Sequence, residues 1–354
     1  MFLETLTELL TNPEYSDVHL ESDGHIWVRH NGELIKTEHR STSSDLSQWL
    51  NTRYKDANIV TELMEMGGQD DFALNVGRTR VRGHAFVSRS KLEIALRRLP
   101  ADIPALHTLG LPSMLPELIS ASQGLILITG PTGSGKTTTM ASMVDSRNEN
   151  TASHIITLED PIEYIYKDKK SRVRQRQVSA RGEGDCRSFD AGVVAAMRED
   201  PDIILVGEMR DHATVQAALT AAQTGHLVFG SLHTNGGMET IDRVLSFYQG
   251  ADRDLAKSVL AATLRCVVSQ RLLKKKDGSR VLAAEVLINT TGVRTHIAQG
   301  QTHLIQQELN TGSSAGQLSL NRTLADLVRQ GLVDAEVALA ASNDRVALER
   351  EIQN

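Results

Sequence analysis

The chain of 354 residues has only two cysteines, Cys186 and Cys266, and neither has a second cysteine or a histidine at a metal-binding spacing. Disulfide frameworks need several cysteines, and structural zinc sites need clustered Cys and His ligands. Both kinds of site are therefore excluded. Isolated cysteines usually behave as small buried residues, so we expect one thiol in a partly buried position and the other packed in a helix.

Aromatic residues are also scarce, at 4% of the chain, and the formal net charge is -6. Proteins that bind single-stranded nucleic acid stack bases on aromatic side chains, and phosphate-binding faces usually need a basic excess. The composition therefore argues against direct binding of nucleic acid. The run Lys274–Lys276 leaves open a contact with an acidic partner or a membrane surface, but such runs are more often solvated loops.

Long apolar runs are missing as well, since none approaches the roughly 18 residues that a membrane-spanning helix needs. Leucines between positions 3 and 10 recur at helical spacing, with glutamates among them and no basic residue before them. This segment predicts a short amphipathic helix that ends at Asn12-Pro13, and not a signal peptide. We therefore expect a soluble, cytoplasmic protein whose membrane association is only peripheral.

The first hundred residues alternate apolar and polar positions in short runs broken by glycine-containing turns. Strands are expected at Val18–Leu20, His25–Arg29 and Arg80–Arg82. A helix-like stretch from Asp45 to Leu63 lies between them. The pattern predicts a small α+β domain over residues 1–100.

The stretch from Pro100 to Pro112 contains three prolines and a glycine. Such a composition is typical of an ordered but non-repetitive linker. We place this linker at residues 101–112.

After the linker, the sequence changes to short, continuously apolar runs with helical patterns between them. These runs are Leu125–Thr129, His154–Leu158 and Ile203–Val206. Apolar strands that alternate with helices predict a mostly parallel sheet covered on both faces. From about Leu318 onward the sequence is rich in alanine and leucine at helical spacing. We therefore predict an α/β domain over residues 113–354 that ends in a helical part.

Residues Gly130–Thr137 match the phosphate-binding pattern G-x-x-x-x-G-K-[S/T] at every fixed position, directly after an apolar run. Glycines let backbone N–H groups converge on an anion. Lys136 supplies charge to the β- and γ-phosphates, Thr137 offers a hydroxyl to Mg²⁺, and the following helix directs its positive end at the phosphates. An accidental glycine-rich turn is the alternative, but the flanking strand and helix patterns favour nucleotide binding. The predicted nucleotide-binding residues are Gly130, Pro131, Thr132, Gly133, Ser134, Gly135, Lys136, Thr137 and Thr138.

An acidic segment, Thr157–Tyr164, lies at the end of the second apolar run. Pro161 ends the strand, so Glu159, Asp160 and Glu163 are expected to cluster near its carboxyl end. Ligands of open α/β sheets bind at this edge, and hydrolysis of ATP needs a carboxylate that orients water. A solvated acidic turn is the alternative.

The third apolar run is followed by Gly207-Glu208, where the common Walker B pattern has an aspartate. A carboxylate at the end of a buried strand is costly unless it has a function or a partner. Glu208 is therefore a candidate for holding the water shell of a metal ion, and Arg210 is a candidate salt-bridge partner.

Two histidines flank a further apolar run, with His226 before it and His233 after it. A lone histidine is most often structural, but a pair in this position can donate to a γ-phosphate or sense its loss. From these residues alone, both interpretations stay open.

The four blocks, in this order, resemble the secretion ATPase superfamily of type II and type IV systems, whose characteristic set is Walker A, Asp box, atypical Walker B and His box. The stretch Arg198–Asn235 is especially similar to the PilT branch of pilus retraction motors. Ser16–Leu20 and Ala95–Pro100 resemble the two ends of the family's N-terminal PAS-like domain, and Val267–Leu272 resembles a helix of its core. The resemblance covers nearly the whole chain.

The C-terminal part shows a second similarity. Ser269–Leu273 and Asp277–Val281 are somewhat closer to PilU, the accessory retraction paralogue. A leucine-rich retraction signature that PilT proteins often have near the C-terminus is not evident.

The resemblance implies a RecA-like P-loop NTPase core preceded by a PAS-like α+β domain, assembled as a homo-hexamer. It implies that Glu163 polarises the attacking water and that Glu208 and Thr137 serve the metal. Arginines of the N-terminal domain would reach the nucleotide of a neighbouring subunit, with Arg78 as a further candidate. The catalytic residues so implied are Glu163, Glu208, His226, His233, Arg80 and Arg82.

The implied activity is ATP hydrolysis coupled to mechanical work, with Mg²⁺, in a hexameric motor that powers type IV pilus retraction and twitching motility. The implied partners are an inner-membrane pilus platform protein and a paralogous motor ATPase, and the implied location is the cytoplasmic side of the inner membrane. Two alternatives stay open: a motor for a type IV-like conjugation or secretion system, and an ATP-binding scaffold or accessory subunit that hydrolyses ATP weakly.

Overall fold

The structure is a computed structural model that describes residues 2–30, 32–52, 59–66, 68–77, 79–179, 184–311 and 316–353. The chain forms two compact units. The N-terminal unit comprises residues 1–102 with the segments 160–165 and 179–185, and the core unit comprises residues 103–159, 166–178 and 186–354. Each unit has its own hydrophobic core.

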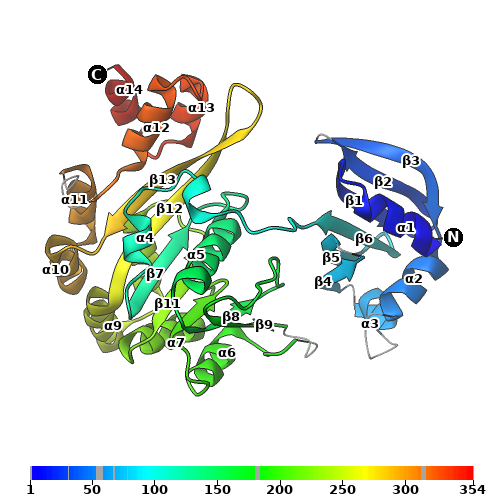
Figure 1. The fold of residues 1–354 in the computed structure, drawn as a ribbon, viewed down its shortest axis with the longest axis horizontal. Helices are drawn as coiled ribbons and strands as arrows, with labels where there is room; N and C mark the ends of the chain where they lie inside the picture. Colours follow the sequence, from blue (N-terminus) through cyan, green and yellow to red (C-terminus); the bar gives the residue numbers. More distant parts are fainter. Residues whose placement is uncertain are drawn as a thin grey trace. The chain divides into compact units, whose positions relative to one another are not determined.

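The N-terminal unit is built on a six-stranded antiparallel sheet with strand order β3-β2-β1-β6-β5-β4 (Figure 1). Its strands are β1 (Tyr15–Glu21), β2 (Gly24–His30), β3 (Glu33–Ser41), β4 (Gln69–Val76), β5 (Thr79–Ser88) and β6 (Lys91–Arg98). Side chains alternate between the two faces. In β5, Val81 and Ala85 are buried, whereas Arg80, Arg82 and His84 point to the other face and are half-buried. The strands predicted in this unit are thus confirmed.

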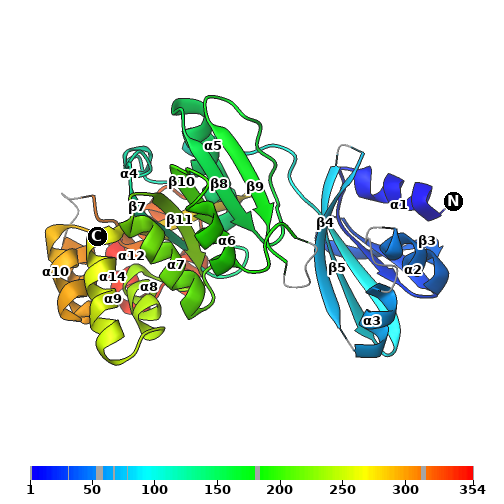
Figure 2. The same cartoon turned by 90° about the horizontal axis from the view of Figure 1, so that it is seen from below.

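Helices cover one face of this sheet (Figure 2). They are α1 (Phe2–Thr11), α2 (Ser43–Asn51) and α3 (Ile59–Met66). Leu6 and Leu10 of α1 and Leu46 and Leu50 of α2 are buried in the same core as the inward side chains of the strands. The amphipathic N-terminal helix is confirmed, although Leu3 at its start is exposed.

The single helix expected from Asp45 to Leu63 is wrong. Helix α2 ends at Asn51, with Thr52 as its C-cap, and the Thr52 hydroxyl donates to the Trp49 carbonyl. A separate helix begins at Ile59, and residues 53–58 lie outside the described part of the chain.

The core unit contains a seven-stranded sheet with order β13-β12-β7-β11-β10-β8-β9 (Figure 1). Its strands are β7 (Gly124–Thr129), β8 (His154–Glu159), β9 (Arg172–Gln177), β10 (Ile203–Val206), β11 (Leu227–Leu232), β12 (Leu264–Lys274) and β13 (Arg280–Ile288). All neighbouring strands pair in parallel except β12 and β13, which form an antiparallel pair. The three predicted apolar runs are the buried strands β7, β8 and β10.

Helices cover both faces of this sheet (Figure 2), as predicted. One face packs against α6 (Phe189–Ala196), α7 (His212–Gln223), α8 (Gly237–Ser246), α9 (Gly250–Thr263), α10 (Thr291–Gln299), the 3₁₀ turn η2 (Thr302–Leu304) and α11 (Ile305–Thr311). The other face packs against the 3₁₀ turn η1 (Leu106–Thr108), α4 (Leu115–Leu118) and α5 (Lys136–Asn150). The strands β7, β8, β10 and β11 therefore bury side chains on both sides, which explains why their sequences are almost continuously apolar.

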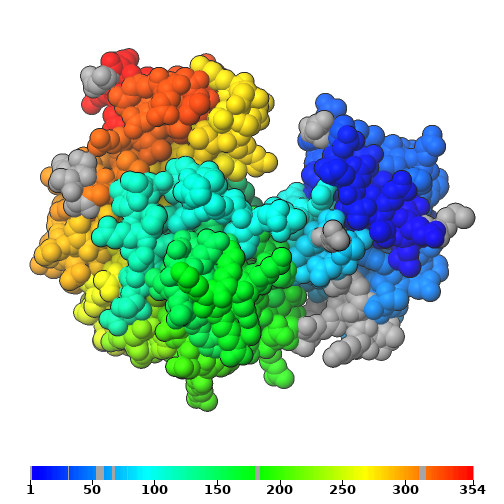
Figure 3. All heavy atoms as spheres, in the orientation of Figure 1, coloured from blue at the N-terminus to red at the C-terminus, as the bar shows by residue number. Residues whose placement is uncertain are grey.

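The chain ends in a helical module of α12 (Leu320–Arg329), α13 (Ala335–Ala341) and α14 (Arg345–Gln353), as predicted. This C-terminal module packs on the β12–β13 hairpin, with Leu324, Ala338 and Leu348 in a core shared with Leu273 and Ala283. Figure 3 shows the module, in orange and red, directly against the yellow hairpin.

The lysine run at the end of this hairpin is tied to acidic residues of the same chain. Lys275 Nζ lies 3.3 Å from Asp277 Oδ2, and Lys276 Nζ lies 3.5 Å from Asp334 Oδ1. These pairs favour a solvated turn over a partner contact.

Two expectations for the region around Cys266 are wrong. Val267–Leu272 lies in strand β12 and not in a helix, because it pairs with β7 on one side and β13 on the other. Cys266 is consequently packed in a strand, and burial raises the pKa of its thiol to about 12. Cys186 is buried and not partly buried.

Across the described residues, no helix combines the length and the apolar character that a bilayer-crossing segment would need. The predicted fold class, an α/β core with a small α+β domain before it and a helical part after it, is confirmed.

Gly83 of β5 provides a test of the N-terminal sheet. It lies opposite Phe72 of β4, and a Cβ atom at Gly83 would lie 2.0 Å from Phe72 Cε2. Because Phe72 is buried, Gly83→Ala should overpack this core and lower the free energy of unfolding by about 1–3 kcal/mol. Chemical denaturation of Gly83→Ala, with Ser88→Ala in the same strand as the control, measures the effect. Equal stability of the two variants would contradict this packing.

Candidate active site

The predicted phosphate-binding loop connects the carboxyl end of β7 to the first turn of α5. Gly133 and Gly135 have φ angles of +79° and +90°, in the left-handed region that favours glycine. Gly130 lies against the next strand of the sheet, because a Cβ atom there would be 2.4 Å from the Gln270 carbonyl oxygen. The loop therefore has no room for side chains at its start and turns sharply into the helix, whose N-terminal N–H groups face the loop.

Two polar side chains of this loop are buried. Lys136 is 9% exposed, and its Nζ donates to the carbonyls of Gly130 at 2.8 Å and Pro131 at 3.2 Å. Ser134 is 2% exposed, and its hydroxyl has no hydrogen-bond partner among the described residues. The Ser134 hydroxyl thus lacks an acceptor among these residues, and the buried Lys136 ammonium contacts backbone carbonyls and a histidine. Phosphate oxygens would supply both groups with further acceptors. The loop thus fits the nucleotide that its sequence predicts.

Parallel pairing brings two further side chains to this edge of the sheet. Leu232, at the end of β11, lies beside Thr129, at the end of β7, and β10 ends on the other side of β11. His233 follows β11 directly, and Glu208 lies two residues after β10. Both residues therefore leave the sheet where the phosphate-binding loop begins.

These residues form a continuous polar chain. Lys136 Nζ lies 3.4 Å from His233 Nδ1, and His233 Nε2 lies 2.9 Å from Glu208 Oε1. The other carboxylate oxygen of Glu208 accepts a hydrogen bond of 2.7 Å from Arg210 Nη2. The partner that the sequence suggested for Glu208 is thus present, together with a histidine that links the carboxylate to the phosphate-binding lysine.

Burial and charge shift the pKa values of this chain. Burial lowers the pKa of Lys136, against the opposite effect of the Glu208 carboxylate. Burial alone would raise the pKa of Glu208, but the hydrogen bond and charge of Arg210, together with His233, hold it below the ordinary value. Glu208 is therefore ionised at neutral pH and available to orient His233.

His226 is not brought to this site. It precedes β11, and its neighbour Leu227 pairs with Gly124 and Ile203 at the starts of β7 and β10. At about 3.3 Å per residue, the strand separates His226 from His233 by about 23 Å. Within one chain the two histidines therefore do not lie at the same phosphate, because they leave opposite ends of one strand. The His226 ring instead lies 2.9 Å from the Ala221 carbonyl.

The acidic segment after β8 divides between the two units. Glu159 belongs to the core unit, where its Oε1 accepts hydrogen bonds from Thr157 Oγ1 at 2.6 Å and from Gln175 Nε2 at 3.0 Å. Asp160 and Glu163 belong to the N-terminal unit. The three carboxylates expected to cluster thus belong to two different units, and Glu159 is buried in the core unit.

Within the N-terminal unit, the arginines of β5 hold this loop. Arg80 Nε and Nη2 donate to the Ile162 carbonyl at 2.9 and 2.8 Å, and Arg82 Nη1 lies 3.4 Å from Glu163 Oε1. Arg82 is also 3.6 Å from Asp71 Oδ1. Both arginines therefore contact the acidic loop of their own chain, and their action on a neighbouring subunit stays a prediction. Arg78 lies outside the described residues.

A metal ion at this site would need phosphate oxygens among its ligands. No group of three or more His, Cys, Asp or Glu side chains that could hold a metal occurs within the described ranges. Both carboxylate oxygens of Glu208 contact other side chains, which does not favour it as a metal ligand. Thr137, in the first turn of α5, is half-buried beside Lys136, so its hydroxyl fits a metal ion that is also held by phosphate oxygens.

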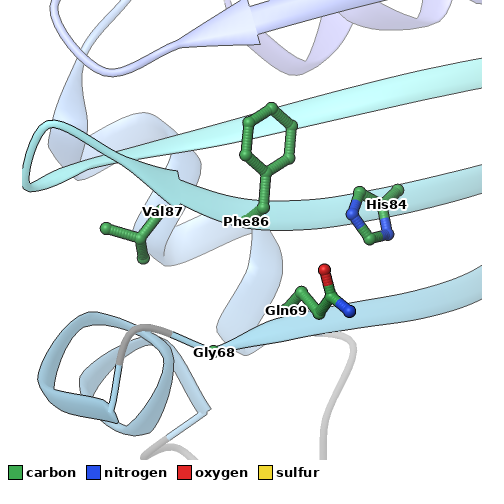
Figure 4. Close-up of a pocket in the computed structure, with 5 residues that line it drawn as sticks. All are labelled: Gly68, Gln69, His84, Phe86 and Val87. Atoms are coloured by element: carbon green, nitrogen blue, oxygen red, sulfur yellow. The ribbon is translucent and has the colours of Figure 1, made fainter.

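A separate pocket of about 330 Å³ lies in the N-terminal unit and is lined by Gly68, Gln69, His84, Phe86 and Val87 (Figure 4). The His84 ring stacks on Phe86 with centroids 5.5 Å apart. None of the predicted nucleotide-binding residues lines this pocket, so it is not the candidate site.

Comparison with known proteins agrees with this geometry. A family model described as "Type II/IV secretion system protein" matches residues 4–334. The chain belongs to this family. The recognition made from the four sequence blocks is thus confirmed.

Individual relatives match the chain over most of its length. The uncharacterized protein YggR of Escherichia coli is 39% identical over 94% of this chain and 99% of its own length. The type IV pilus retraction ATPase PilT of Pseudomonas aeruginosa is 37% identical over 94% of this chain and 96% of its own length. A crystal structure of the pilus retraction motor PilT with bound ADP is 42% identical, covers 98% of both chains and has a TM-score of 0.87.

Two residues near the site of this family member were not found from the sequence. The carbonyl of Gln270 packs against Gly130, and its Nε2 donates to Thr139 Oγ1 at 2.8 Å. Arg271 donates from Nη1 to the Gln270 carbonyl at 3.3 Å. Because their segment was expected to be a helix, nothing in the sequence placed them beside the phosphate-binding loop.

The lowered pKa of Glu208 predicts how its contribution to stability depends on pH. The ionised carboxylate stabilises the folded protein above its ordinary pKa of 4.5, and this contribution is lost as the pH falls through the lower pKa of the folded state. Glu208→Gln should therefore unfold at a lower temperature than the unsubstituted protein at pH 7, and the difference should shrink as the pH falls below 4.5. Thermal melts between pH 7 and pH 3.5 measure this, with Glu117→Gln as an exposed control. A difference in melting temperature that does not change with pH would show that the charge of Glu208 does not stabilise the fold.

Proposed function

We propose that this protein is a hexameric motor that hydrolyses ATP to power the retraction of type IV pili. The observation that carries the proposal is the Lys136–His233–Glu208 chain beside a phosphate-binding loop, in a chain that matches an ADP-bound pilus retraction motor over 98% of both lengths. Membership of a secretion ATPase family also supports an ATPase.

The phosphate-binding loop would hold the nucleotide. The backbone N–H groups from Gly133 to Lys136, and the N-terminus of α5, present positive partial charge to the β- and γ-phosphates. The Ser134 hydroxyl would find its acceptor in a phosphate oxygen, and the Lys136 ammonium would exchange a carbonyl contact for a phosphate contact. Thr137 would contact Mg²⁺, which neutralises phosphate charge when bound.

Glu163 is our candidate for the carboxylate that orients the attacking water, because the resemblance assigns it this role and Arg82 holds it in place. Glu208 accepts from His233 Nε2, which leaves Nδ1 of the neutral ring as an acceptor for the Lys136 ammonium. His233 would therefore sense the γ-phosphate through Lys136. Arg210 keeps Glu208 ionised for that purpose. We propose that Glu208 orients His233, in place of the metal role expected for it, because both of its carboxylate oxygens contact other side chains.

The assembly and the partners follow from the family. We propose a homo-hexamer in which Arg80 and Arg82 face the nucleotide of a neighbouring subunit. It would act on a platform protein at the cytoplasmic side of the inner membrane, alone or beside a paralogous motor ATPase. Two alternatives to this proposal are tested below. One is a motor of a conjugation or secretion system, and the other is a scaffold that hydrolyses ATP weakly.

The chemical roles predict different losses for two variants. Lys136→Ala should abolish nucleotide binding, because it removes the charge that balances the phosphates. Glu163→Gln should keep nucleotide binding and lower kcat by roughly two to four orders of magnitude, because it removes only the water-orienting carboxylate. Binding of a fluorescent ADP analogue and steady-state phosphate release separate the two effects, with Glu117→Gln as the control. Turnover of Glu163→Gln at the unsubstituted rate would make the catalytic assignment wrong.

The cellular role predicts the direction of the pilus phenotype. Deletion of the gene should leave pili assembled, and more abundant, while twitching is lost, because retraction fails and assembly continues. Surface pili counted by electron microscopy, with a complemented strain and a Glu163→Gln strain beside the deletion, measure this. Cells without pili would contradict retraction and favour assembly, whereas normal twitching with a secretion defect would favour the secretion motor.

A further inference from the structure

The segment that follows His233 is fixed by an unusually complete set of hydrogen bonds. Asn235 N donates to Glu239 Oε2 at 2.9 Å, and Gly237 N donates to Glu285 Oε1 at 2.7 Å. The Thr240 hydroxyl donates to the Gly236 carbonyl at 2.7 Å. We call residues 233–237 the His233 loop. Since its backbone has little freedom, the position of His233 depends on what holds this loop.

The carbonyl of Asn235 receives two donors from distant parts of the core unit. Arg271 Nη2, from β12, and Asn343 Nδ2, from the turn between α13 and α14, both lie 3.1 Å from this oxygen. Arg271 Nη2 also lies 3.3 Å from Asn343 Oδ1. Two side chains therefore meet on one carbonyl, two residues after the histidine that contacts Lys136.

Arg271 also reaches toward the other side of the phosphate site. Its Nη1 donates to the carbonyl oxygen of Gln270. A Cβ atom added at Gly130 would lie 2.4 Å from this same oxygen, so the oxygen packs against the start of the phosphate-binding loop. One guanidinium thus ties the start of the phosphate-binding loop to the His233 loop. The buried Glu285 beside it holds Gly237 and attracts Arg271, which keeps the guanidinium half-buried in this position.

Asn343 is held by the C-terminal module. The hydroxyl of Ser342 donates to Asn321 Oδ1 at 2.6 Å, and Asn321 Nδ2 donates to the Asp344 carbonyl at 2.9 Å. Asn321 belongs to α12, so the turn that presents Asn343 is fixed to the helix that packs on β13. A displacement of the module would therefore move Asn343 relative to Asn235.

We propose that Arg271 and Asn343 are positioning residues for His233, and that the C-terminal module controls turnover at the nucleotide site through Asn343. The proposal rests on the proposed ATPase function, since His233 is the group that it positions. Arg271 and Asn343 contact the His233 loop, the Gln270 carbonyl and each other, and not the predicted nucleotide-binding residues. We therefore expect their substitution to change turnover and not nucleotide affinity.

Kinetics of single and double variants test the coupling. Asn343→Ala should lower kcat by about three- to tenfold, in keeping with the loss of one hydrogen bond, and leave ADP affinity within about twofold. Arg271→Ala should lower kcat by about tenfold or more, and Arg271→Lys should recover part of it, because an ammonium can reach one carbonyl but not both. The double variant should be no slower than Arg271→Ala, because both residues act on the same oxygen. Effects that multiply, or an unchanged kcat in Asn343→Ala, would overturn the proposal.

Hydrogen exchange provides a readout that does not need turnover. Asn343→Ala should speed amide exchange in peptides covering residues 231–240, with the rest of the core unit unchanged. Arg350→Ala, an exposed substitution in α14, should leave both exchange and kcat as they are. Unchanged exchange in Asn343→Ala would overturn the positioning role even if Arg271→Ala does not fold. An unsubstituted protein that hydrolyses no ATP would instead overturn the proposed function, and the exchange result would still decide the positioning role.

Discussion

Lys136, His233 and Glu208 meet because β7, β11 and β10 run parallel and end at one edge of the core sheet. Parallel pairing puts the residues that follow each strand on the same side, although they lie up to about a hundred positions apart in the chain. The cores on both faces fix the strands, and the strands fix the chain of contacts from the phosphate-binding lysine to Arg210. A change that shifted one strand relative to its neighbours would separate these groups.

Contacts between side chains balance the charges at this edge of the sheet. A buried ammonium is unfavourable unless it has acceptors, and here backbone carbonyls and His233 supply them, while the Glu208 carboxylate attracts the charge of Lys136. Glu208 in turn stays ionised because Arg210 and His233 both contact it. A triphosphate entering the site would add acceptors to a cluster already rich in donors, which explains how a buried lysine can be retained before the ligand arrives.

Two other groups of residues proposed for hydrolysis follow strands of the core sheet. The loop with Glu163 follows β8, yet it packs with the N-terminal unit through Arg80 and Arg82. The His233 loop follows β11, yet its carbonyl is held from β12 and the C-terminal module. The residues proposed for hydrolysis are therefore each attached to a different part of the protein, an arrangement that suits a motor in which chemistry and movement depend on each other.

The sequence by itself determined the phosphate-binding loop, the apolar strands that flank it, the fold class and the Glu208–Arg210 pair, since each depends on neighbours within a few positions. It also assigned the family, because four such blocks occur in order. The positions of His226 and of Val267–Leu272 were decided only by the tertiary structure. A histidine before a strand and one after it look equivalent in sequence, but they lie at opposite edges of the sheet. An apolar segment with one arginine fits a helix or a strand equally well, and only pairing with β7 and β13 makes it β12. The contacts of Arg271 with Asn235 and Asn343 have no sequence signal at all, because they join residues 36 and 72 positions apart through packing that local patterns do not record.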